Sequence, residues 1–140
     1  MLFPSCWYGD RAYTYSGLTL EPRALTPRLD RLREVAESVA GSTFNTVLVN
    51  LYRDGRDSMG WHADDERELG AEPVIVSLSF GASRRFRFRH RESREIVEIA
   101  LESGSALVMG GLTQHCWMHD LPKTTKVNEP RVNLTFRHIA

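Results

Sequence analysis

The chain has 140 residues, and its 18 basic and 18 acidic side chains give a formal net charge of zero. This length fits one domain with a single core, and no apolar run reaches the roughly 20 residues that span a membrane. Two cysteines are too few for a disulfide framework or a thiolate zinc site, so we expect a cytoplasmic protein, or a nuclear one in a eukaryote. Zero net charge argues against a uniformly basic nucleic-acid binder, but it allows a local basic patch.

The clearest predicted helix lies in the first third of the chain. Thr26 suits an N-cap, Pro27 suits the first helical position, and Gly41 is a natural stop. Apolar side chains between them recur at steps of three and four residues, which predicts one apolar stripe that packs against the rest of the domain. The stripe consists of Leu29, Leu32, Val35, Ala36 and Val39.

From residue 44 onward the pattern changes to period two, which predicts short strands separated by turns. One helix followed by many such strands favours a mostly β protein, a sandwich or jelly roll with one or two helices packed outside. The predicted strands cover residues 44–52, 74–80, 85–91, 95–101, 105–109 and 131–138.

The sharpest candidate for a metal site is the tripeptide His62-Ala63-Asp64. Residues two apart in an extended segment face the same side, so His62 and Asp64 can reach one ion. Two histidines and one carboxylate on one face of an octahedral ion are typical of non-haem Fe(II) oxygenases. On the tripeptide alone, a surface histidine beside an acidic run is the more common explanation. The third ligand would come from His90, His115, His119 or His138.

The predicted strand at 131–138 alternates polar and apolar side chains. The apolar face, with Val132, Leu134 and Phe136, suits packing between sheets. The other face suits a ligand with two carboxylates, since arginine binds carboxylates bidentately; on an edge strand it would be solvated. Asn50 and Tyr52 likewise share one face of the earlier predicted strand and could contribute to the same ligand site. The alternative is that Asn50 lies at a turn and Tyr52 is an ordinary buried tyrosine. The polar face consists of Arg131, Asn133, Thr135 and Arg137.

In this order, the motifs resemble the AlkB-type Fe(II)/2-oxoglutarate dioxygenases that reverse alkylation of nucleic acids. The resemblance runs from about residue 8 to the C-terminus and is closest to the branch with the DNA-repair dealkylases. It implies a double-stranded β-helix (jelly roll) core and a single catalytic domain over residues 1–140, with an N-terminal nucleotide lid that is short or missing. The strings that carry it are DRAYTYSGLTL, WHADDEREL, WMHDLPK and RVNLTFR.

The resemblance also implies a role for each matched residue. The iron ligands and catalytic centre would be His62, Asp64 and His119. The 2-oxoglutarate site would consist of Asn50, Tyr52, Arg131, Asn133, Thr135 and Arg137. The contacts to the target base would come from Tyr13, Tyr15, Ser16, Asp65 and Glu66, although aromatic side chains at such positions are more often buried in a core.

The implied reaction is oxidative dealkylation of N-alkylated bases in DNA, with single-stranded DNA favoured and RNA left open. Fe(II) would be the metal and 2-oxoglutarate and O2 the cosubstrates, with release of succinate, CO2 and an aldehyde. The cofactor performs the difficult chemistry while the protein orients the reactants. We expect a monomer with no membrane partner. The alternatives are the same iron chemistry on a protein or lipid side chain, and a non-catalytic nucleic-acid-binding module on the same fold.

The zero net charge is a sum over opposed regions. Residues 84–94 hold six arginines against one acid, and residues 53–72 hold seven acids against three arginines. Arg85, Arg87 and Arg89 share one face of a predicted strand, which predicts contacts to phosphates and salt-dependent binding. A solvated charged hairpin is the alternative.

Overall fold

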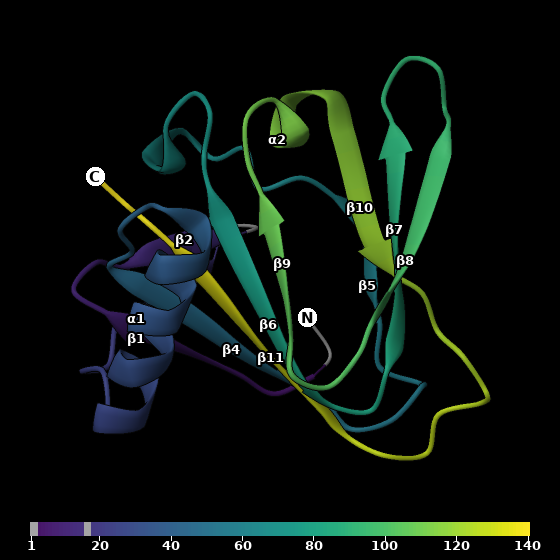
Figure 1. Cartoon of the computed structure of the whole chain (residues 1–140), viewed down its shortest axis with the longest axis horizontal. Coiled ribbons are helices and arrows are strands. Elements are labelled where there is room, and N and C mark those ends of the chain that lie inside the picture. The colour runs from purple at the N-terminus through teal and green to yellow at the C-terminus, as the bar shows by residue number, and fades with distance from the viewer. Residues whose placement is uncertain (1–2, 16–17) are drawn as a thin grey trace.

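The structure is a computed structural model that describes residues 3–15 and 18–140. It contains two main antiparallel sheets that face each other, as the predicted jelly roll requires (Figure 1). In spatial order, the first sheet consists of β1 (Ser5–Gly9), β4 (Thr46–Tyr52), β11 (Arg131–Arg137), β6 (Ile75–Gly81) and β9 (Ser105–Met109). The second consists of β5 (Met59–His62), β10 (Trp117–Leu121), β7 (Arg84–His90) and β8 (Ile96–Leu101). A separate hairpin joins β2 (Tyr13–Tyr15) to β3 (Leu18–Leu20).

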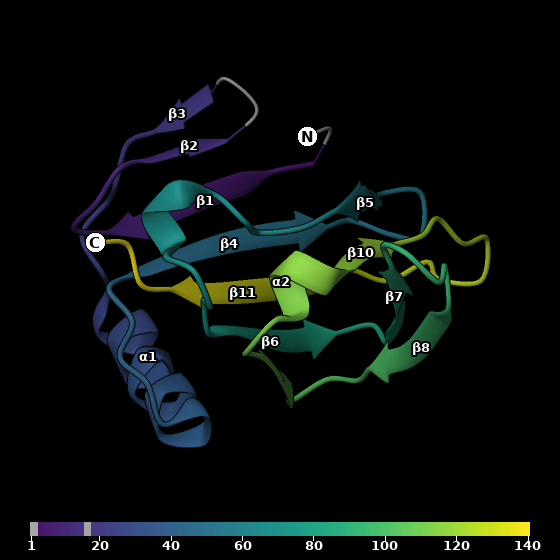
Figure 2. The same cartoon turned by 90° about the horizontal axis from the view of Figure 1, so that it is seen from above.

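Helix α1 (Pro27–Ala40) begins and ends where the sequence predicts. The Thr26 hydroxyl accepts a hydrogen bond from the Leu29 amide at 3.2 Å, and Gly41 closes the helix in the left-handed conformation at φ 66°. The helix lies on the outer face of the five-stranded sheet, away from the second sheet (Figure 2). A second, short helix, α2 (Thr113–Cys116), follows β9, and Arg67–Leu69 form one 3-10 turn. No helix in the described part of the chain is long and apolar enough to cross a membrane.

The predicted apolar stripe of α1 is only partly buried. Ala36 is completely buried and Leu29 packs against the same core, but Val35 and Val39 are 50% and 54% exposed. A step of one residue turns a helix by about 100°, so Val35 points well away from the side on which Ala36 meets the sheet. The helix therefore buries a narrower stripe of apolar side chains than the sequence pattern predicts.

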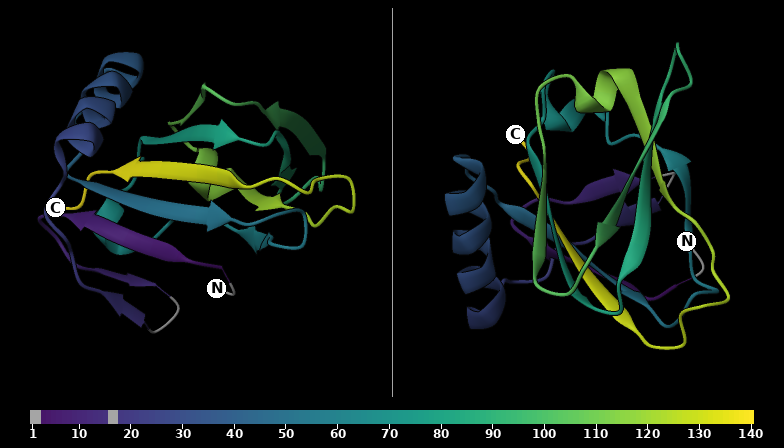
Figure 3. Two further views of the ribbon diagram at one scale, coloured as in Figure 1. Left: turned by 90° about the horizontal axis from the view of Figure 1, so that it is seen from below. Right: turned by 45° about the vertical axis from the view of Figure 1, so that its right-hand side comes forward.

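Strand β11 lies in the middle of its sheet, between β4 and β6 (Figure 3). The interpretation that its apolar face packs between the sheets is wrong. Leu134 and Phe136 instead join Ala36 of α1 in the core on the outer side of the sheet. Because the helix covers the apolar face, the polar face of β11 points into the space between the two sheets. All four polar residues of that face are buried, so the solvated alternative is also excluded.

Replacing Phe136 by alanine should strongly destabilise the fold, because Phe136 is completely buried between the sheet and α1. We expect the free energy of unfolding to fall by about 3–5 kcal/mol. The matched control is Phe80→Ala at a residue that is 37% exposed, where a loss of no more than about 1 kcal/mol is expected. Urea unfolding of both variants measures the difference, and equal losses would contradict this packing.

Candidate metal and cosubstrate site

One cavity between the two sheets collects all nine residues that the sequence assigns to iron and 2-oxoglutarate. The ligand-type histidines come from the second sheet and the arginines from the first. The register explains the grouping: Arg131 pairs with Tyr52, and Asn133 pairs with Asn50, across β11 and β4. The nine are His62, Asp64, His119, Asn50, Tyr52, Arg131, Asn133, Thr135 and Arg137.

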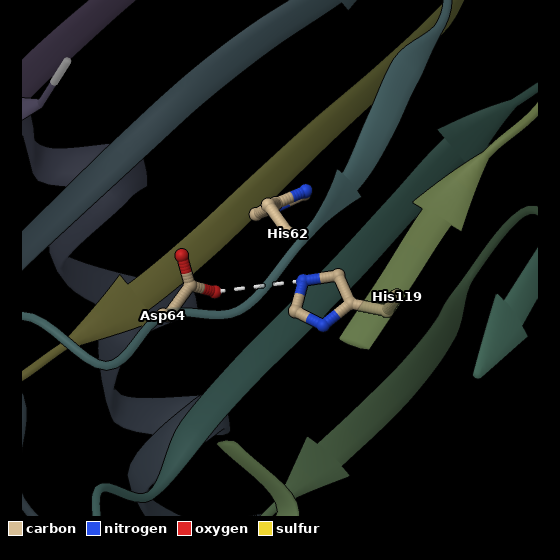
Figure 4. Close-up of side chains that lie close together, drawn as sticks. All are labelled: His62, Asp64 and His119. Carbon is tan, nitrogen blue, oxygen red and sulfur yellow. Dashed lines mark ion pairs between the residues drawn. The ribbon is translucent and has the colours of Figure 1, made fainter. Parts of the chain in front are cut away.

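Three of these side chains converge at one end of the cavity (Figure 4). His62 and His119 occupy paired positions on β5 and β10, and Asp64 lies two residues after the end of β5. One ligand atom from each lies within 4.8 Å of the others, and His119 Nε2 is 3.7 Å from Asp64 Oδ2. In the described part of the chain, this is the one group of three or more His, Cys, Asp or Glu side chains close enough to hold an ion.

Two of the three converging side chains are in the protonation state that metal binding requires. Burial raises the pKa of Asp64, but Arg137 and the two histidines outweigh it and lower the pKa below its usual value. Burial and the neighbouring His62 lower the pKa of His119 to about 4, so its imidazole is neutral at neutral pH. A carboxylate and a neutral imidazole are the ligand forms, so these residues fit a divalent ion.

Hydrogen bonds around the three side chains fix their orientation. His62 Nδ1 donates to the Gly60 carbonyl at 2.8 Å, which leaves the Nε2 lone pair for a metal. The amide of Asp64 donates to the side-chain oxygen of Gln114 at 2.8 Å, and Arg137 Nη2 lies 3.3 Å from Asp64 Oδ1. Gln114 is completely buried and was not predicted from the sequence, because the four-residue helix α2 is too short to show a periodic pattern.

Arg131 is a buried cation at the other end of the cavity. It is 2% exposed, donates to Ser79 Oγ at 2.9 Å, and lies over the Tyr52 ring at 5.1 Å. It forms no ion pair with any carboxylate of the described residues, and its Nε atom has no hydrogen-bond partner there. Burial lowers its pKa. A buried charge without a counter-charge is costly, so this position favours an anionic ligand.

The remaining polar residues hold one another in place along the wall of the cavity. The amide of Asn133 donates to Ser77 Oγ at 2.6 Å and to the Leu78 carbonyl at 3.1 Å, and its oxygen accepts from the Thr135 hydroxyl at 2.9 Å. Asn50 Oδ1 is buried without a partner in the described residues, so it is an acceptor open to a ligand. Ser77 and Ser79 were missed, although they alternate with apolar residues in the string VIVSLSF.

Of the residues assigned to the target base, the two whose side chains the structure describes, Asp65 and Glu66, do not line this cavity. Asp65 is exposed and pairs with Arg91 at 3.3 Å. Tyr13 and Tyr15 belong to β2, but their side chains, and all of Ser16, lie outside the described residues. Their assignment to the base stays a prediction.

The three arginines predicted to contact phosphates differ in their surroundings. Arg85 is exposed and pairs with Glu98 at 3.0 Å. Arg87 donates two hydrogen bonds to Asp120, at 2.9 and 2.5 Å. Arg89 has no carboxylate partner in the described residues and lies over the Trp61 ring at 4.3 Å. Arg89 is therefore the cation best placed for a phosphate, and Arg87 is already neutralised within the protein.

Comparison with known proteins agrees with this geometry. The profile of the 2OG-Fe(II) oxygenase superfamily matches residues 2–137, so the chain belongs to that superfamily, and Fe(II) and 2-oxoglutarate are its cofactor and cosubstrate. A solved structure described as "The structure of OsALKBH1" has the same fold, with a TM-score of 0.67 and 19% identity over 96% of this chain and 77% of that one.

The resemblance to AlkB-type dioxygenases is also confirmed. The chain is 49% identical to "DNA oxidative demethylase ALKBH2" of Homo sapiens, over 94% of this chain and 54% of the relative. It is 46% identical to "Alpha-ketoglutarate-dependent dioxygenase alkB homolog 3" of Homo sapiens, over 96% of this chain and 51% of the relative. The chain thus spans about half the length of the curated relatives that it matches.

The lowered pKa of His119 predicts a loss of stability in acid for the metal-free protein. His119 has a pKa of about 4 in the folded protein and near 6.5 when unfolded, so the unfolded state binds more protons between these values. Its contribution to the free energy of unfolding should therefore decrease from pH 6.5 to pH 4, by up to about 3 kcal/mol, and then level off. Urea unfolding in a chelator, with His119→Leu as the reference, measures this contribution; identical pH dependence in both proteins would contradict it.

Proposed function

We propose that this chain is the catalytic domain of an oxidative dealkylase that acts on N-alkylated bases in DNA. One observation carries the proposal: Arg131, which is buried and has no carboxylate partner among the described residues, shares a cavity with His62, Asp64 and His119. A dianion such as 2-oxoglutarate can neutralise the arginine with one carboxylate and present its other end to a metal at the three ligands. The described residues therefore fit both the ion and the cosubstrate of the superfamily.

In this proposal His62, Asp64 and His119 hold the Fe(II). When bound with 2-oxoglutarate and O2, the ion supplies the oxidative chemistry that converts the cosubstrate to succinate and CO2 and oxidises the N-alkyl carbon. Arg131 binds the far carboxylate, and Ser79 and the Tyr52 ring hold its guanidinium in place.

The other cavity residues support these two functions. Arg137 keeps Asp64 ionised and oriented, since its guanidinium lies against the carboxylate. Asn133 and Thr135 stiffen the wall, and Asn50 offers its free oxygen to the bound ligands. Oxidation leaves a hydroxyl on the N-alkyl carbon, which makes a hemiaminal. Its C–N bond breaks, the base nitrogen keeps the electron pair, and the hydroxyl loses its proton as the aldehyde forms. That collapse requires no strong base from the protein.

The substrate assignment rests on the relatives and on the surface around the site. The ALKBH2 relative is named a DNA oxidative demethylase, and we extend that activity to this chain. The target base must leave the helix stack to reach a buried ion, which is easiest in a single strand. Tyr13, Tyr15, Ser16, Asp65 and Glu66 are the proposed contacts to the base, and Arg85 and Arg89 the proposed contacts to phosphates. We also propose that the protein is a monomer located in the cytoplasm, or in the nucleus of a eukaryote.

The direct test is the release of formaldehyde from a methylated single-stranded oligodeoxynucleotide. With Fe(II), 2-oxoglutarate and O2, we expect one formaldehyde for each base repaired, and none from the unmethylated oligonucleotide. His119→Ala should abolish release, because it removes one of the three ligands. Turnover confined to protein or lipid substrates would overturn the assignment to nucleic acid, and turnover that survives His119→Ala would overturn the ligand set.

Replacing Arg131 by glutamine should raise the KM for 2-oxoglutarate. Loss of a buried charge-assisted pair costs about 2 kcal/mol or more, which corresponds to roughly 30-fold or more in affinity. The control is Arg56→Gln, which removes an exposed arginine that pairs with Asp54 outside the cavity. Steady-state kinetics with varied 2-oxoglutarate measures the change, and an unchanged KM in Arg131→Gln would show that the dianion binds elsewhere.

A further inference from the structure

The strand that carries His62 is weakly held by its backbone. β5 has four residues and lies at the edge of its sheet, so it pairs with β10 alone. The pairing is irregular: His62 faces His119 and Met59 faces Leu121, so Gly60 and Trp61 together oppose the single residue Asp120. This is a β-bulge, which interrupts the ladder directly beside the metal site. Backbone pairing alone therefore leaves the separation of the two histidines loosely determined.

One side chain on β7 reaches across both of these strands. Arg87 Nε and Nη2 donate to the two carboxylate oxygens of the buried Asp120 at 2.9 and 2.5 Å. Its Cζ atom also lies 4.9 Å from the centroid of the Trp61 ring. Asp120 directly follows His119 and Trp61 directly precedes His62. A single guanidinium thus contacts the chain neighbours of both histidine ligands.

We propose that Arg87 is a positioning residue that ties β5 to β10 from the outer face of the sheet, through Trp61 and Asp120. Successive residues of a strand face opposite sides, so the tie lies outside while His62 and His119 point inward to the ion. Arg87 then fixes the separation of the two imidazoles without contacting the ion or the substrate. The inference rests on the proposed metal site.

The chemistry of the contact favours this role over a contact to phosphate. A bidentate guanidinium–carboxylate pair is geometrically specific, and the flat face of the same group can stack on an indole. Lysine can reproduce the charge but neither the fork nor the stacking. Arg85, on the same strand and face, forms only an exposed pair with Glu98, and such pairs hold structure weakly.

An anaerobic titration with Fe(II) in the presence of 2-oxoglutarate, without nucleic acid, tests the proposal. The readout is the metal-to-ligand charge-transfer band, which reports metal binding without turnover. We expect Arg87→Ala to raise the apparent Kd for Fe(II) about tenfold or more, as other residues that orient metal ligands do. Arg87→Lys should also raise the Kd although it keeps the charge. The control, Arg56→Ala, removes an exposed arginine that pairs with Asp54 outside the cavity, and it should leave the Kd unchanged.

Arg87→Ala leaves the Asp120 carboxylate buried without its partner, which can destabilise the fold. Trp61→Leu therefore serves as a second variant, because it removes the contact between Arg87 and β5 and leaves the pair of Arg87 and Asp120 in place. It should also weaken Fe(II) binding. An unchanged Kd in Trp61→Leu and in folded Arg87→Ala or Arg87→Lys would overturn the proposal. A changed salt dependence of oligonucleotide binding, with Fe(II) affinity intact, would make Arg87 a phosphate contact instead. Absence of the band in the unaltered protein would refute the proposed function itself.

Discussion

Two guanidinium groups of strand β11 are buried between the sheets, and each requires a negative charge. Arg137 finds one in Asp64, at 3.3 Å. Arg131 has no carboxylate partner among the described residues. This asymmetry organises the cavity: the end near Arg137 holds an ionised carboxylate beside two histidines, and the end near Arg131 is open to an anion. Asp64 balances the charge of Arg137, and a dianion bound at the second end would balance Arg131 and part of the charge of a metal ion held at the first.

The fold makes this burial possible because the two faces of β11 have different surroundings: one packs against α1, and the other lines the cavity. Helix α1 covers the apolar face of β11 and packs on Phe136 and its neighbours. The opposite side of the same strand is therefore free to carry polar groups, which hydrogen-bond to one another through Ser77, Asn133 and Thr135. The histidines come from the facing sheet, where the bulge at Gly60 and Trp61 interrupts the regular pairing of β5 with β10.

Much of the site was predictable because its signals are local. The alternation from Arg131 to Arg137 places four polar side chains on one face, and the spacing of His62 and Asp64 places both beside one ion. The choice of which face points inward was not predictable, since it depends on where α1 packs. The contacts of Gln114 and Arg87 were also not predictable, because their partners lie far away in sequence: Arg87 and Asp120 are 33 residues apart. The phosphate contacts of Arg85, Arg87 and Arg89 were predicted from charge alone. Which of these arginines already pairs with a carboxylate depends on the residues of the neighbouring strands.

In the proposed site one cavity holds both the ion and the dianion, with the ion at the two histidines and the dianion at Arg131. Anomalous diffraction from crystals grown anaerobically with Fe(II) and 2-oxoglutarate would locate both ligands. We expect an iron peak between His62, Asp64 and His119, and a carboxylate of 2-oxoglutarate against the Arg131 guanidinium. An iron peak at any other cluster, or a cosubstrate bound away from Arg131, would contradict this arrangement.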